Sequence, residues 1–207
     1  MRYVSKDDPV TKALARSAMI AAALLVATAC SSTSGTPSPA TSAPPVSTST
    51  GPAVPQVSNP LNASKFEQDP CGLLTRAQAG QFIEGVRTSG KSSGRIPMCN
   101  WHGENGSGFG VSFIVGQGGL ATVYKNGQNG GAGYFEPAPD VSGYPAAFTA
   151  TMDDRKSGGC QIMVGITNDE LVVVGAALWT SSPAYNAPCP VVTKAAELVV
   201  AKLKDGA

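Results

Sequence analysis

Charged and aromatic residues are scarce in this sequence. Asp, Glu, Lys and Arg make up 14% of the 207 residues, and Phe, Trp and Tyr make up 6%, whereas roughly 25% of an average soluble domain is charged. Residues 1–29 hold four of the 15 basic and two of the 14 acidic side chains, which leaves 11 basic and 12 acidic residues. A chain so evenly balanced has no basic surface for nucleic acid, and we expect no such partner.

Histidine and metal-binding cysteine motifs are also nearly absent. His102 is the single histidine and no C-x-x-C pair exists, so we expect neither a metal nor a cofactor. No G-x-S-x-G motif occurs, and we expect no catalytic residue. His102 could still act as the general base of a hydrolase, which is the alternative hypothesis. Asp153 and Asp154, with Glu136 and Asp140, lack the ligand spacing of a calcium loop and predict a solvated turn.

No apolar run is long enough to cross a membrane. The run from Ala18 to Ala29 has 12 residues, whereas a spanning helix needs roughly 20. Basic residues precede this run and Cys30 follows it, which is the layout of a secretory signal peptide. The cysteine resembles that of a bacterial lipobox, so we predict that residues 1–29 are removed and that Cys30 is acylated. The protein would then be lipid-anchored to the extracytoplasmic face of the cell membrane. A plain signal peptide would instead leave Cys30 as an unpaired fifth cysteine.

Residues 31–64 contain no charged and no aromatic residue, and 21 of these 34 positions are Ser, Thr or Pro. Such a composition cannot bury enough apolar surface to offset chain entropy. We therefore predict three parts: a signal peptide over 1–29, a lipid anchor with a disordered stalk over 30–64, and one globular domain over 65–207.

Hydrophobic periodicity predicts the elements of that domain. A capping box at Thr75 and an apolar face predict a helix near 76–84, and similar spacing predicts another helix near 190–204. A short helix is expected near 120–125. Alternating patterns predict strands at 98–101, 109–115, 147–152, 161–166 and 171–178. This order indicates an α+β domain with a single antiparallel sheet of about five strands, on which N- and C-terminal helices pack.

Four cysteines remain in the domain: Cys71, Cys99, Cys160 and Cys189. An even number in an exported chain indicates two disulfides, and three pairings are possible. The favoured pairing joins Cys71 to Cys189, at the starts of the two terminal helices, and Cys99 to Cys160, within two strands. Trp101 shares strand parity with Cys99, so we expect it to pack in the core.

Several short motifs in this order carry a resemblance to a known family. They are Asp69-Pro70-Cys71-Gly72-Leu73-Leu74-Thr75, Cys99-Asn100-Trp101, Gly143-Tyr144-Pro145-Ala146-Ala147, Gly159-Cys160-Gln161 and Ala187-Pro188-Cys189. Over residues 66–204 the chain is similar to the actinobacterial lipoproteins of domain-of-unknown-function family 3558. The resemblance implies an envelope location, disulfides and a compact α+β domain, and it carries no catalytic residue.

Aromatic residues outside the strand cores are the candidates for contact with a ligand or partner. Trp179 and Tyr185 flank the loop at 181–183, and Tyr134 is a third candidate. An anchor, a stalk and a small domain together predict a non-enzymatic binding or accessory module of the cell envelope. Its partner would be an envelope protein or a small apolar ligand. The alternatives are an envelope hydrolase that uses His102 and a purely structural or antigenic surface protein.

Overall fold

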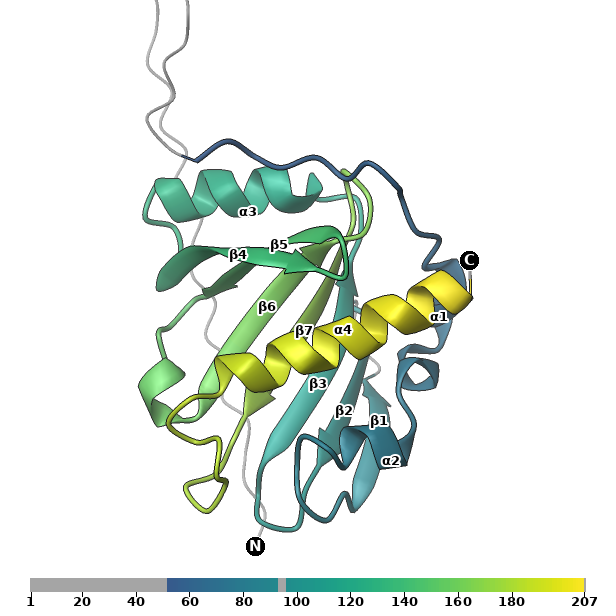
Figure 1. Ribbon diagram of the computed structural model, residues 1–207, viewed down its shortest axis with the longest axis vertical. Coiled ribbons are helices and arrows are strands. Elements are labelled where there is room, and N and C mark those ends of the chain that lie inside the picture. The colour runs from purple at the N-terminus through teal and green to yellow at the C-terminus, as the bar shows by residue number, and fades with distance from the viewer. Residues whose placement is uncertain (1–51, 93–95, 207) are drawn as a thin grey trace, which may run out of the picture. The chain divides into compact units, whose positions relative to one another are not determined.

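The computed structural model describes residues 52–92 and 96–206, so the predicted signal peptide, Cys30 and the stalk up to residue 51 lie outside the described residues. The described part holds one antiparallel sheet of seven strands, in the order β1-β2-β3-β7-β6-β5-β4, and four α-helices (Figure 1). The helices are α1 (Ser64–Gln68), α2 (Arg76–Ala79), α3 (Gly119–Gln128) and α4 (Cys189–Asp205), with two 3-10 turns, η1 (Pro70–Leu73) and η2 (Arg155–Ser157). The strands are β1 (Thr88–Ser92), β2 (Met98–His102), β3 (Gly108–Ile114), β4 (Tyr134–Val141), β5 (Tyr144–Ala150), β6 (Gly159–Gly165) and β7 (Leu171–Ala177). The predicted α+β class with a single antiparallel sheet is confirmed.

The larger core lies between one face of the sheet and α4. Successive residues of a strand point to opposite faces, and β3 follows this rule: Phe109, Val111 and Phe113 are buried, whereas the residues between them are half-exposed. From α4, residues at helical spacing enter the same core, namely Val192, Ala195, Ala196, Val199, Val200 and Leu203. The predicted C-terminal helix is therefore confirmed, and Trp101 is buried in this core as expected.

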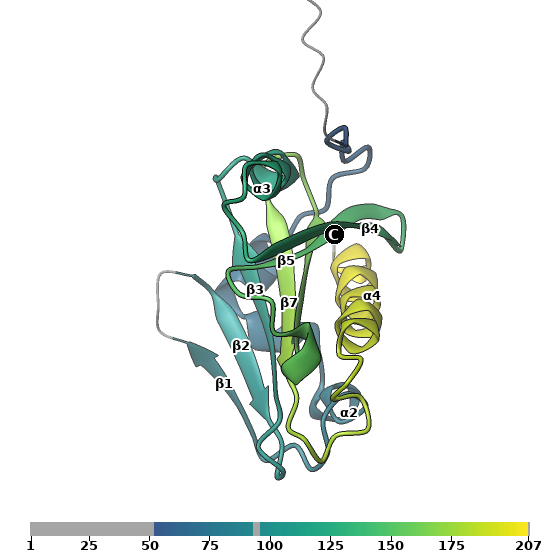
Figure 2. The same ribbon diagram turned by 90° about the vertical axis from the view of Figure 1, so that its left-hand side faces the viewer.

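A smaller core lies between the opposite face of the sheet and α3. Leu120 and Tyr124 from α3 pack with Ala147 of β5 and Leu171 of β7, so α3 and α4 lie on opposite faces of the sheet (Figure 2). Ten helical residues span only about 15 Å. As a result, α3 covers one end of this face, and no other described helix packs over the remainder.

The sheet has seven strands, whereas the sequence predicted about five. The prediction was too low because the sequence pattern did not identify β1 and β4. Both are edge strands. β1 reads Thr-Ser-Gly-Lys-Ser and has no apolar residue, and β4 contains Pro137 and Pro139. Proline lacks the N–H that a central strand needs, so it is confined to sheet edges and bulges. A strand is recognised in a sequence by its alternating apolar residues, so edge strands that lack this alternation are not identified.

The folded domain begins earlier than the predicted boundary at residue 65. Val57, Leu61 and Ala63 are buried in the larger core. The amide of Leu61 donates to the carbonyl of Ile166 at 2.9 Å, and the amide of Val57 donates to Asn168 Oδ1 at 2.9 Å. The last part of the predicted stalk therefore belongs to the domain. Within the described residues, no helix has both the length and the apolar character that crossing a membrane requires.

Two disulfides form among the four predicted cysteines, but the predicted pairing is wrong. Cys71 bonds to Cys99 and Cys160 bonds to Cys189, with Cα–Cα distances of 5.0 and 5.2 Å. β3 and β7 lie between β2, which carries Cys99, and β6, which carries Cys160. Three strand spacings amount to about 14 Å, whereas a disulfide needs Cα atoms within about 7 Å. Each strand cysteine therefore bonds to the helical turn that packs above it.

Candidate functional site

The part of the sheet face that α3 leaves uncovered forms an open groove of about 370 Å³. This volume lies within the range of small-ligand sites, roughly 300–1,000 Å³. Its floor comes from the face of β2, β3, β7 and β6 that points away from α4. The lining residues include Met98, Asn100, His102, Gly108, Gly110, Ser112, Asp154, Gln161, Val173, Gly175 and Ala177.

Glycines form the centre of the groove floor. Gly110 and Gly175 are paired across β3 and β7, in one cross-strand row with Gly90, Asn100 and Gln161. A Cβ atom at Gly175 would meet no atom closer than 3.9 Å, and one at Gly90 would meet none within 4 Å. Packing within the chain therefore does not require glycine at these two positions, although glycine inside a strand costs about 0.5–1 kcal/mol relative to alanine. Such glycines mark places where a ligand or another backbone approaches closely.

The carboxamide side chains of Asn100 and Gln161 lie on opposite sides of this floor. A Cβ atom at Gly110 would lie 2.7 Å from Asn100 Oδ1, so glycine there leaves room for the Asn100 side chain. Gln161 Nε2 donates to the carbonyl of Thr149 at 2.9 Å, which fixes the orientation of that side chain. Three strand spacings, about 14 Å, separate the two strands that carry them. A carboxamide both donates and accepts hydrogen bonds, so the pair can orient a neutral polar group.

The groove carries little charge. His102 and Asp154 are its ionisable residues, and neither lysine nor arginine occurs among the described residues that line it. Met98 and Val173 supply apolar walls next to Ser112. An exposed antiparallel face is ordinarily polar. This face is instead mostly small and apolar, which suits an uncharged ligand better than a phosphate or carboxylate.

His102 does not form a catalytic pair with the serine of the groove. His102 is exposed at the end of β2, in register with Gly108. Ser112 lies four residues further along β3, which corresponds to about 13 Å. A general base must lie within hydrogen-bond reach of the proton it removes. The geometry therefore places His102 at the edge of the groove without assembling a Ser112–His102 pair.

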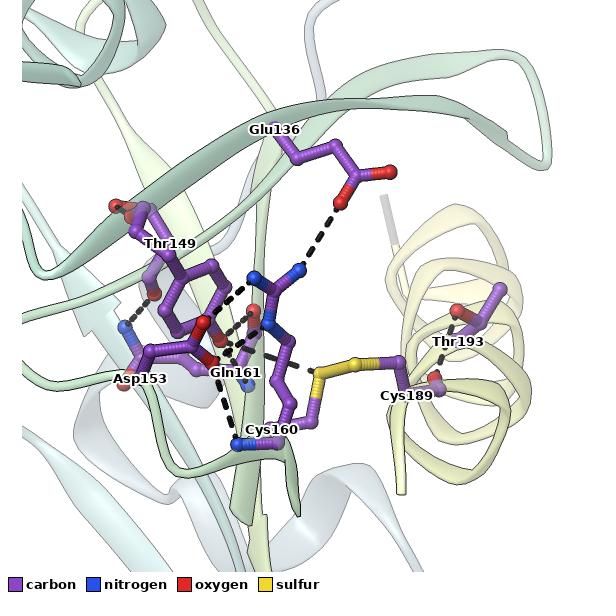
Figure 3. Close-up of a disulfide and its surroundings, with 9 residues drawn as sticks. Glu136, Thr149, Asp153, Cys160, Gln161, Cys189 and Thr193 are labelled. Atoms are coloured by element: carbon purple, nitrogen blue, oxygen red, sulfur yellow. Dashed lines mark hydrogen bonds and ion pairs between the residues drawn. A yellow bond between two sulfur atoms is a disulfide. The ribbon is translucent and has the colours of Figure 1, made fainter. Parts of the chain in front are cut away.

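Two of the four acidic residues considered for cation binding, Asp153 and Glu136, are engaged by Arg155. Arg155 Nε and Nη2 bond to the two carboxylate oxygens of Asp153 at 2.7 and 2.8 Å, and Nη1 bonds to Glu136 Oε2 at 3.0 Å (Figure 3). Hydrogen bonding from Arg155 lowers the pKa of Asp153 to about 2. Among the described residues, no three His, Cys, Asp or Glu side chains gather in a way that could hold a metal ion.

Tyr134 is not available as a contact residue. Its side chain is buried, with 8% of the residue exposed, and the guanidinium of Arg155 lies 4.2 Å from the centre of its ring. Its hydroxyl accepts a hydrogen bond from the amide of Gln161 at 3.1 Å. The sequence-based prediction of Tyr134 as a partner contact is therefore wrong, because the ring packs inside the domain.

Trp179 and Tyr185 both lie in the loop between β7 and α4, as expected from the sequence. Trp179 is 59% exposed, and its amide donates to Ser107 Oγ at 3.0 Å, which attaches this loop to the β2–β3 turn. Tyr185 is half-buried against Gly158. Neither residue lines the open groove. Trp179 therefore offers a separate exposed apolar surface.

The same loop forms one wall of a second groove, of about 420 Å³. Ala184 and Ala187 from the loop face Phe82, and Pro190 and Val191 from the first turn of α4 complete the apolar lining. The groove lies beside the start of α4, and Cys189 is the first residue of that helix.

Asn100, Gln161 and the floor glycines were missed at the sequence level. A signal was present, because Gly108, Gly110 and Ser112 alternate with Phe109 and Val111 along β3. The alternation identifies one buried face but does not show whether a helix covers the other. The open groove depends on the length of α3, which pattern alone could not place on this face.

Comparison with known proteins gives a family and no activity. No curated protein and no solved structure matches the chain. A family model matches residues 25–202, which include all seven strands and most of α4. The similarity to family 3558 noted from the sequence motifs is thereby confirmed. The chain belongs to the family described as protein of unknown function (DUF3558).

Proposed function

We propose that this chain is a non-enzymatic binding module on the extracytoplasmic side of the cell membrane, held there by a lipid on Cys30. In this proposal the open groove on the sheet is its ligand site. The observation that carries the proposal is the groove floor, where Gly175 has room for a side chain and carries none. Two disulfides in the described domain support an oxidising location.

The ligand would be small and uncharged, with an apolar body and one or two polar groups. Met98 and Val173 would contact the apolar body, while Asn100 and Gln161 would bond the polar groups. This division between apolar walls and a few placed polar groups is typical of small-molecule sites. The absence of lysine and arginine among the described lining residues disfavours anionic ligands.

The test fills the groove without disturbing the fold. Gly175→Leu places a side chain on the floor, where the nearest atoms are 3.9 Å from the new Cβ. Ala201→Leu adds the same side chain to the exposed surface of α4 and is the matched control. Uncharged amphipathic compounds, with Nile red as the first probe, are titrated into the mature chain and followed by amide chemical shifts.

We expect shifts at Asn100, Gly110, Gln161 and Gly175 in the parent and in Ala201→Leu. In Gly175→Leu the affinity should fall by at least about tenfold, since the added side chain occupies the ligand volume. Binding that leaves these four amides unchanged, or that survives in Gly175→Leu, would contradict the assignment of the groove.

The hydrolase alternative is tested with His102→Ala. The proposed module should turn over no ester, glycoside or peptide substrate, with or without His102. Turnover by the parent that disappears in His102→Ala would replace the binding proposal with an enzymatic one.

A further inference from the structure

The two disulfides have different surroundings, and the Cys160–Cys189 bond is the distinctive one. Cys160 of β6 is 3% exposed, whereas Cys189 is half-buried and is the first residue of α4 (Figure 3). A thiol from solution can therefore approach one sulfur of the bond more easily than the other. α4 has 17 residues, and the positive end of its dipole lies where an anionic thiolate would arrive at Cys189.

A hydrogen-bond donor lies beside the buried sulfur. The hydroxyl of Tyr134 is 4.0 Å from Cys160 Sγ. Because its oxygen accepts the amide proton of Gln161, its own proton points to other acceptors, which are Cys160 Sγ and the carbonyl of Gln161 at 3.4 Å. Burial raises the pKa of Tyr134, so the hydroxyl stays protonated at neutral pH. The guanidinium of Arg155 lies on the Tyr134 ring, but Asp153 and Glu136 offset its charge, so the hydroxyl itself is the group that can stabilise a thiolate here.

The Cys71–Cys99 bond shares the uneven burial, because Cys71 is half-buried like Cys189, but among the described residues it has neither the long helix nor the hydroxyl donor. Cys99 is fully buried on β2, where its neighbours across the sheet and along the strand are Val111 and Trp101. Cys71 lies in η1, a turn of four residues, which has no dipole comparable to that of α4. The two bonds enclose nearly equal lengths of chain, with separations of 28 and 29 residues. Cys71–Cys99 is therefore an internal control for Cys160–Cys189.

We propose that Cys160–Cys189 is an exchangeable disulfide that accepts small thiols at Cys189, whereas Cys71–Cys99 is a permanent crosslink. The incoming thiolate attacks Cys189 Sγ and forms a new disulfide with it. The bond between the two protein sulfurs breaks, and its electron pair leaves on Cys160 Sγ as a thiolate. The Tyr134 hydroxyl donates a hydrogen bond to this thiolate. The reverse attack by Cys160 releases the thiol and restores the bond, so no net oxidant is needed.

Exchange would alter the second groove without unfolding the domain. α4 remains attached through its buried residues from Val192 to Leu203. The loop before Cys189 would lose its covalent link to β6, and this loop supplies Ala184 and Ala187 to the groove wall. The thiol carried on Cys189 would lie next to that apolar groove, so thiols with an apolar portion should react best. This inference does not depend on what the open sheet groove binds.

The experiment uses the folded mature chain and reduced glutathione as the probe. Samples are quenched with iodoacetamide over time and mapped by peptide mass spectrometry under non-reducing conditions. We expect a glutathione adduct on Cys189 with a free thiol on Cys160, while Cys71–Cys99 stays intact. An adduct on Cys160, or opening of Cys71–Cys99 at an equal or higher rate, would overturn the proposal.

Tyr134→Phe tests the role of the donor. A hydrogen bond to a charged group is stronger than one to a neutral group, so exchange at Cys189 should slow by about tenfold or more. Tyr144→Phe alters a second buried tyrosine of the larger core and should leave the rate unchanged. An unchanged rate in a folded Tyr134→Phe protein would refute the donor role. If this variant does not fold, the order in which the two bonds open in the parent still decides whether Cys189 is the reactive position.

Discussion

Asp153 and Arg155 form a surface ion pair whose strength depends on pH. The hydrogen bond from Arg155 lowers the pKa of Asp153 from 3.8 to about 2. Since the folded pKa is below the unfolded value, the pair stabilises the domain above about pH 4, and this stabilisation is lost as the pH falls towards 2. Asp153→Asn should therefore lower Tm slightly at pH 7, because exposed pairs contribute little. Thermal unfolding from pH 2 to 7 should show the two curves converging at low pH; an offset that persists at pH 2 would contradict this explanation.

The pKa of Glu170 is shifted in the opposite direction to that of Asp153. Burial raises its pKa, and the nearby Glu67 and Asp169 raise it further. A carboxyl group with a raised folded pKa opposes folding when it is ionised, so its unfavourable contribution disappears as the pH falls. Glu170→Gln should raise Tm at pH 7 and match the parent below the ordinary carboxyl pKa. Equal melting temperatures at pH 7 would show that the charge of Glu170 costs nothing in the fold.

Among the elements, α4 contributes most directly to the larger core. Leu203 in its last turn is fully buried. Leu203→Ala should lower the free energy of unfolding by about 2–5 kcal/mol, because deletion of a buried side chain leaves a cavity. Urea unfolding measures the change, and Lys202→Ala on the exposed side of the same turn is the control. A loss below 1 kcal/mol would mean that this turn is less well packed than the structure indicates.

Sequence patterns predicted helices and strands well where apolar residues repeat at regular spacing, and poorly elsewhere. α4 and the central strands β3, β6 and β7 carry such repeats, and all were predicted close to their observed bounds. The edge strand β1 has no apolar residue, so only its pairing with β2 identifies it as a strand. The sequence pattern could not predict the groove floor, for a related reason. Gly110 and Gly175 become neighbours only through the pairing of β3 with β7, two strands far apart in the sequence.

For the whole molecule, the disulfide pairing shows what sequence alone leaves open. Counting cysteines gives the number of bonds, but the partners depend on strand order. The order β2-β3-β7-β6 separates Cys99 from Cys160, while η1 and the start of α4 lie over these strands. The two bonds therefore join helical turns to the sheet at two separate places. This arrangement leaves each bond free to differ in reactivity, as the proposed exchange at Cys189 requires.

The proposed location of the whole molecule depends on Cys30, which lies outside the described residues. An acyl anchor with more than one chain holds a protein stably on a membrane, and the lipobox-like position of Cys30 predicts such an anchor. Cys30→Ala should therefore move the protein from the membrane fraction to the medium, or leave it as an uncleaved precursor. Metabolic labelling with a fatty-acid analogue, followed by fractionation, measures both effects, and Cys30 is the natural choice because the other four cysteines are bonded. Label that remains on the Cys30→Ala protein would place the lipid elsewhere and remove the basis for an N-terminal anchor.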